Sequence, residues 1–119
     1  MENFVSFEIA KLLKEKGFRS KSEGLYDGSG ELLYYTHSNN EMQRFRYEAP
    51  TVAVVVMWLY EKHRIWIAVN MDLVGRWYYD AYIIKDGLPN HNTYKKIDRF
   101  NSPTEAYEAA IEYILNNLI

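Results

Sequence analysis

The pattern of hydrophobic and polar positions near the amino terminus predicts an amphipathic helix over residues 4–16. Its apolar stripe at helical spacing contains Val5, Ile9, Leu12 and Leu13. Gly17 stands where helices commonly end in a left-handed residue, and Phe18 can fold back on the last turn. The helix is therefore expected to end at Gly17.

A second amphipathic helix is predicted at the carboxyl terminus. Ser102, Pro103 and Glu105 supply an N-cap, a proline at the first helical position and the glutamate of a capping box. The expected buried stripe is Tyr107, Ala110, Ile111, Ile114, Leu115 and Leu118. This helix should extend almost to Ile119.

A period of two in the middle of the chain predicts a β-hairpin. The segments IWIAVNM and RWYYDAYIIK alternate on either side of turn residues 72–75. One face of the hairpin should carry Ile65, Ile67, Val69, Trp77, Tyr79, Ala81 and Ile83, and the other Trp66, Ala68, Tyr78, Asp80 and Tyr82. Further short strands are expected over 31–36 and 93–97, after turns at 27–30 and 86–90, and the polar segment 37–48 is expected to be a loop.

The apolar segment from Val52 to Lys62 could form either a strand or a helix. Its β-branched residues favour a strand, but its length exceeds that of a typical strand and Thr51 is a suitable N-cap. We interpret it as a helix whose core stripe contains Val52, Val55, Val56, Leu59 and Tyr60. Val54, Met57 and Trp58 then form a second apolar stripe, which is either buried between other elements or a contact surface for a partner.

The resulting order is helix, strand, helix, strand, strand, strand, helix. It predicts an α+β fold with a small antiparallel sheet of three to four strands packed with three helices. A chain of 119 residues has room for one hydrophobic core, so a single domain over 1–119 is expected.

Composition and charge exclude several classes of protein. The chain has no Cys, which removes disulfides and thiolate chemistry, and its formal net charge of -2 gives no general attraction for nucleic acid. The first residues lack the pattern of a signal peptide, and the apolar run near Val52 is too short to span a membrane. A cytoplasmic protein without membrane contact is expected.

Three segments resemble a family of short uncharacterised proteins of gut Bacteroidetes, often found in phage or mobile-element settings. The segments are MENFVSFEIAKLLKEKGF, YEAPTVAVVVMWL and SPTEAYEAAIEYILNNLI, and the resemblance covers most of the chain. It implies that the segment after Ala49-Pro50-Thr51 is an amphipathic helix. It implies no activity, cofactor or catalytic residue.

The sequence offers no strong candidate for chemistry. His37, His63 and His91 lack a second His at metal-ligand spacing, and nucleotide or esterase motifs are absent. Asp80 stands in an apolar strand on the same face as Arg76, and a solvated cross-strand partner explains it better than catalysis. We therefore expect a protein that is not an enzyme, with no catalytic residue, metal or cofactor.

Aromatic residues are the most prominent candidates for function, because they make up 16% of the chain and some rings must reach the surface. Trp66, Tyr78 and Tyr82 with Arg76 resemble a stacking platform for single-stranded nucleic acid, and Arg64, Lys95 and Lys96 lie near the same sheet. The negative net charge makes this the second hypothesis. The leading one is a protein-interaction domain that forms a homodimer or binds an unidentified protein through Val54, Met57, Trp58 and the aromatic sheet face.

Overall fold

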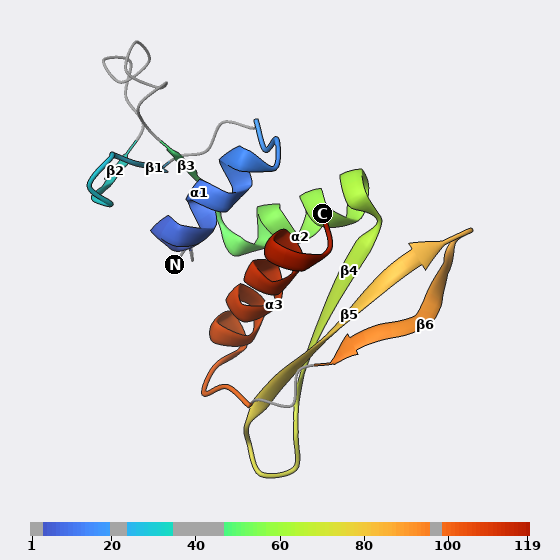
Figure 1. Cartoon of the computed structure of the whole chain (residues 1–119). Helices are drawn as coiled ribbons and strands as arrows, with labels where there is room; N and C mark the ends of the chain where they lie inside the picture. Colours follow the sequence, from blue (N-terminus) through green and yellow to red (C-terminus); the bar gives the residue numbers. More distant parts are fainter. Residues whose placement is uncertain (1–3, 20–23, 35–46, 96–98) are drawn as a thin grey trace. The chain divides into compact units, whose positions relative to one another are not determined.

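The computed structural model describes residues 4–19, 24–34, 47–95 and 99–119. Their elements follow the order α1 (Phe7–Glu15), β1 (Gly24–Tyr26), β2 (Leu32–Tyr34), β3 (Tyr47–Ala49), α2 (Val52–His63), β4 (Ile65–Met71), β5 (Trp77–Lys85), β6 (Leu88–Lys95) and α3 (Pro103–Asn117) (Figure 1). The α+β class and the expected order of elements are confirmed, with β1 and β3 as additional strands. The strands divide into two three-stranded sheets, β2-β1-β3 and β4-β5-β6.

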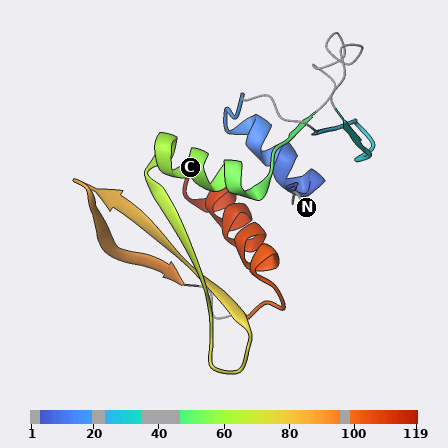
Figure 2. The same ribbon diagram turned by 180° about the vertical axis from the view of Figure 1, so that it is seen from behind.

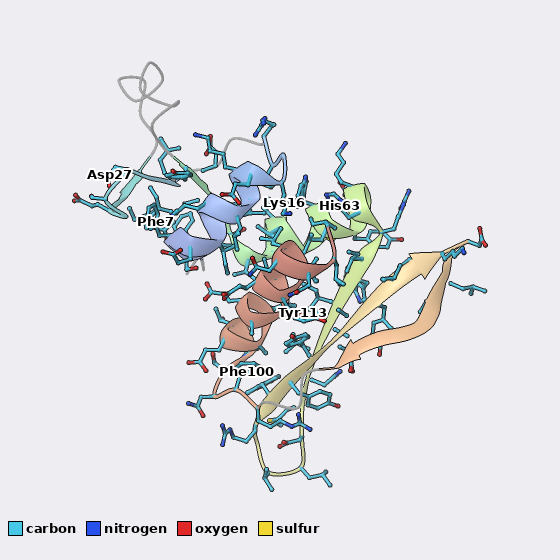
Figure 3. All side chains as sticks on the ribbon, viewed as in Figure 1. Phe7, Lys16, Asp27, His63, Phe100 and Tyr113 are labelled. Carbon is cyan, nitrogen blue, oxygen red and sulfur yellow. The ribbon has the colours of Figure 1, made fainter. Side chains whose placement is uncertain are left out.

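The chain forms two compact units, residues 1–52 and 53–119. The expected single domain remains a prediction. In the first unit β1 pairs with β2 and β3 in antiparallel register, and α1 packs against β3. The Phe7 ring contacts the rings of Tyr26 and Tyr47 at centroid distances of 5.5 and 5.6 Å. Figure 3 shows Phe7 on α1 and Asp27 at the β1–β2 hairpin.

Helix α1 begins three residues later than the sequence pattern indicates. The Ser6 side chain accepts a hydrogen bond from Ile9 N, whereas Phe4 forms an antiparallel bridge with Thr51. An N-cap hydroxyl satisfies an otherwise unpaired N–H, so Ser6 sets the start of the helix. The expected end is confirmed, because Gly17 has a φ of 93° and Phe18 N donates to Leu13 O at 2.9 Å.

Helix α2 confirms the choice of helix for the apolar segment. Its inner stripe is buried and consists of Val52, Val55, Val56 and Leu59. Val54 and Met57 are exposed on the opposite side, with 47% and 45% of their surfaces accessible. The helix ends at His63, where a cationic side chain would be stabilised by the helix dipole, and Arg64 then takes a φ of 55° as the chain turns into β4.

The second sheet has the two faces that the alternation predicts. The register places Ile67 opposite Ala81 and Trp66 opposite Tyr82, so the two residues of each pair share a face. Helix α3 packs against β4 and β5, and both views show it beside these strands, with β6 beyond β5 (Figures 1 and 2). The side chains buried on this face are Ile65, Ile67, Tyr79 and Ala81.

Helix α3 starts as its sequence predicts. Ser102 Oγ accepts from Glu105 N at 3.1 Å, and Glu105 Oε2 accepts from Asn101 N at 3.0 Å. The helix buries Ala106, Ala110, Ile111, Ile114 and Leu115. Tyr107 and Leu118, expected in the stripe, are only half-buried, and the smaller Ala106 takes the inward position near the start of the helix.

Three loop and strand predictions need correction. The turn expected over 86–90 is confined to Asp86 and Gly87, both with positive φ, and β6 begins at Leu88 instead of position 93. Asp-Gly forms a two-residue turn whose twist matches that of a hairpin, which explains the longer strand. Tyr47 and Glu48, placed in the expected loop, belong to β3, and β2 begins at Leu32, one residue later than predicted. The rest of that loop and residues 35–36, 96 and 97 lie outside the described residues.

Candidate functional site

The face of the β4-β5-β6 sheet that points away from α3 carries three of the seven predicted interaction residues, Trp66, Tyr78 and Tyr82. We call Trp66, Ala68, Tyr78, Asp80 and Tyr82 the aromatic face. The Trp66 side chain is exposed, with 38% of its surface accessible, and Tyr78 and Tyr82 are half-buried. The register brings Trp66 and Tyr82 directly opposite each other on neighbouring strands. The structure therefore brings together three of the predicted aromatic residues on one surface.

Helix α2 borders this surface at one end. The Tyr60 ring meets Trp66 edge-on at a centroid distance of 5.7 Å, and the Arg64 guanidinium lies over Tyr60 at 5.6 Å. Aromatic pairs in this geometry are attractive because the positive edge of one ring faces the negative face of the other. Tyr60 thus holds the Trp66 ring at the edge of the aromatic face.

Asp80 lies at the centre of the aromatic face and is buried. Only 8% of its surface is accessible, and its Oδ1 has no hydrogen-bond partner among the described residues. It stands between Tyr78 and Tyr82 along β5, and the register places Ala68 and Lys95 on either side of it. The expectation that Asp80 has a solvated cross-strand partner is therefore wrong, because the side chain is buried and no described residue bonds to its Oδ1.

An unpaired buried oxygen is costly. Leaving a buried acceptor without a partner costs about 1 to 3 kcal/mol, and more for a charged group. Buried polar groups in native proteins are nearly always hydrogen-bonded, so each exception calls for an explanation. Asp80 is such an exception.

The turn between β4 and β5 engages two arginines near the end of the aromatic face. Asp72 Oδ1 accepts from Arg76 N at 2.9 Å, and Asp72 Oδ2 pairs with Arg99 Nε at 3.2 Å. The hydrogen bond from Arg76 N is the largest of the effects that hold the pKa of Asp72 below its ordinary value. Arg76 Nη2 donates to Arg99 O, and the Arg99 guanidinium lies over the Tyr78 ring at 4.8 Å.

The outer stripe of α2 is a separate candidate surface. Val54 and Met57 are exposed, while Trp58 is half-buried and its ring meets that of His63 edge-on at 4.9 Å. Figure 3 shows His63 at the end of this helix. Trp58 therefore presents only part of its ring to a partner.

Sequence reasoning missed the apolar tip of the β4–β5 hairpin. Met71, Leu73 and Val74 have 57%, 105% and 82% of their surfaces accessible. Leu73 and Val74 fall in the predicted turn 72–75, and Met71 ends the predicted strand before it. A turn is usually polar, but hydrogen bonds to Asp72 Oδ1 hold this one in shape without help from its apolar side chains. The presence of Leu73 and Val74 inside the turn is the sequence signal that could have revealed this apolar tip.

A small cavity lies in the first unit, next to α1. Its volume is about 150 Å³, and Leu13, Phe18 and Leu25 line it with Lys14, Arg19 and Glu48 among its other lining residues. Pockets for drug-sized ligands usually measure about 300 to 1,000 Å³. Arg19 Nη1 donates to the carbonyl oxygens of Lys14 and Phe18.

Within the described ranges, no three His, Asp or Glu side chains gather as ligands of a metal ion would. His37 lies outside these ranges. The strongest cluster of acids is on α3, where Glu108 is flanked by Glu105 and Glu112. Partial burial, followed by the negative charges of Glu105 and Glu112, raises the pKa of Glu108 above its ordinary value of 4.5.

Glu108→Gln is expected to raise the melting temperature at pH 7. A carboxyl whose pKa is raised by folding destabilises the fold above that pKa, and this penalty disappears as the pH falls below the unfolded value of 4.5. Relief of two like-charge pairs is worth about 0.2 to 0.5 kcal/mol each. Thermal unfolding of wild type and Glu108→Gln at pH 7 and pH 4 tests this. Glu61→Gln, at an exposed position of α2, is the control. An equal gain at both pH values would contradict it.

No family model, no curated protein and no solved structure matches this chain. The resemblance to the Bacteroidetes family remains a prediction. The fold and the site define an α+β protein with an aromatic sheet face on the side away from α3. None of its helices, within the part of the chain that the structure describes, is long and apolar enough to cross a membrane.

Proposed function

We propose that this chain is a non-enzymatic protein-binding domain whose aromatic face engages a protein partner. The observation that carries the proposal is the exposed Trp66 beside the half-buried Tyr78 and Tyr82 on a sheet face that α3 leaves uncovered. Tryptophan and tyrosine are the residues most enriched in the energetic centres of protein interfaces.

The support beneath this surface suits rapid and specific recognition. The opposite face of the same strands is fixed by buried Ile67, Tyr79 and Ala81 under α3. A rigid sheet presents its rings in one arrangement before the partner arrives, which lowers the entropy lost on binding. The outer stripe of α2, with Val54, Met57 and Trp58, is a second surface, suited to self-association as a homodimer.

Single-stranded nucleic acid is a less favoured ligand. Stacking platforms of that type lie on basic surfaces. Here a carboxylate, Asp80, occupies the centre of the rings, and Arg99 at their end is paired with Asp72. A phosphate backbone would meet the Asp80 carboxylate, and the Arg99 charge that could attract it is already balanced by Asp72.

Selection of displayed random peptides on the wild-type protein tests the proposal. We expect peptides whose affinity falls at least tenfold on Trp66→Ala, because truncation of a central interface ring removes most of its contact area. Met57→Ala, on the outer stripe of α2, should retain their binding. Circular dichroism of each variant shows that it is folded.

Two results would overturn the proposal. The first is that no selected peptide distinguishes wild type from Trp66→Ala. The second is that an oligothymidine quenches tryptophan fluorescence in a salt-dependent way while no peptide binds. Light scattering at two concentrations shows whether the partner is a second copy of the chain.

A further inference from the structure

We propose that the aromatic face recognises an arginine side chain of its protein partner, with Asp80 receiving the guanidinium and the rings of Trp66, Tyr78 and Tyr82 covering it. This inference rests on the proposed function and names the chemistry of its ligand. It starts from the Asp80 carboxylate. Only 8% of the residue's surface is accessible, and its Oδ1 receives no hydrogen bond from any described residue.

Asp80 needs a positively charged donor. A buried carboxylate is stabilised when a cation brings hydrogen bonds to its oxygens, and such charge-assisted bonds are about twice as strong as neutral ones. The described arginines near this face are engaged elsewhere. Arg76 donates to Arg99 O, and Arg99 pairs with Asp72. Neither supplies Asp80 with its counter-charge.

The surroundings of Asp80 favour an organic cation. Tyr78 and Tyr82 flank it along β5, and Trp66 lies across from Tyr82 on β4. Ring faces attract cations electrostatically, and the attraction grows when water is excluded. A bare metal ion would instead need further oxygen ligands, and no such cluster exists among the described residues.

A carboxylate beside aromatic rings favours arginine over lysine as the ligand. A guanidinium is planar, stacks on tyrosine and tryptophan rings, and offers a fork of N–H donors that matches a carboxylate. It is also less strongly hydrated than an ammonium, so its transfer to a half-buried site costs less. Tyr78 and Tyr82 are half-buried, so part of each side chain is accessible to a partner.

Lys95 is the competing cation within the chain. The register places it directly opposite Asp80 on β6. If Lys95 were the permanent partner of Asp80, an arginine from outside could bind only after Lys95 was removed. The two cases are separated by a Lys95→Met variant.

The test is a titration of isotope-labelled protein, followed by amide and indole NMR signals, with N-acetyl-L-arginine methylamide. We expect saturable shifts that are largest for Trp66, Ala68, Asp80 and Tyr82. The neutral isostere N-acetyl-L-citrulline methylamide should bind at least tenfold more weakly, because it lacks the charge. Asp80→Asn should weaken arginine binding at least tenfold while the other signals keep their positions. Lys95→Met should bind arginine at least as tightly as wild type.

Several outcomes would overturn the inference. They are equal binding of the arginine and citrulline probes, the absence of saturable shifts, and binding that appears only in Lys95→Met. The citrulline comparison uses the wild-type protein, so it stays decisive even if Asp80→Asn does not fold. Some selected peptides lose affinity on Trp66→Ala and so bind through the aromatic face. If these peptides keep their affinity when each of their arginines is replaced by citrulline, this inference is overturned and the proposed function stands. A failure to select any such peptide would count against the proposed function itself.

Discussion

Leu59→Ala is expected to destabilise the protein by about 2 to 5 kcal/mol, the usual cost of emptying a leucine site in a packed core. Leu59 is on the inner stripe of α2 and is 0% accessible. Met57→Ala, two positions away on the outer stripe, removes a side chain with 45% of its surface accessible and should change stability by no more than about 0.5 kcal/mol. Urea unfolding followed by circular dichroism measures both.

The comparison decides what the two apolar stripes of α2 do. A small effect at Leu59 would show that the inner stripe is not core. A large effect at Met57 would show that the outer stripe is covered in solution, and its dependence on protein concentration would then tell self-association from intramolecular burial.

Asp80→Leu is expected to stabilise the isolated protein by about 1 to 3 kcal/mol, because it removes a buried acceptor that has no partner among the described residues and replaces it with an apolar side chain. Asp80→Asn keeps a polar group in place and should give a smaller gain. Urea unfolding measures the two variants in parallel.

The same leucine variant should lose binding of the arginine probe. A gain in stability with a loss of binding is the pattern expected where a residue is kept for function at the expense of the fold. A loss of stability in Asp80→Leu would instead mean that the carboxylate has a partner in the folded chain, and Lys95 would be the first residue to replace.

The predicted elements agree with the structure where one physical signal dominates. The N-cap and proline at Ser102 and Pro103 place the start of α3, because the Ser102 hydroxyl accepts from an otherwise unpaired N–H and Pro103 has no N–H that needs a partner. The alternation through β4 and β5 places each side chain on its observed face, because a shift of one residue would expose Ile67 and bury Trp66. In α2 the length of the apolar run outweighs its β-branched residues.

The parts that escaped prediction depend on contacts far apart in the sequence. Strands β1 and β3 have three residues each, which is too short for a period of two to stand out, and they pair across 20 or more positions from Gly24 to Ala49. The burial of Asp80 follows from the size of the side chains around it and from the register with β6, neither of which local pattern reveals. The sequence therefore indicates where the aromatic residues gather but not that a carboxylate is enclosed by them.

The position of β4 at the border of its sheet has a consequence for the protein in concentrated solution. In the order β4-β5-β6, this strand pairs with β5 along one side, and its segment IWIAVNM contains no charged residue. Natural proteins commonly protect such strands with lysine, proline or a bulge, since unpaired backbone groups are a template for another chain. Intermolecular β-pairing, and with it aggregation, would therefore start from β4.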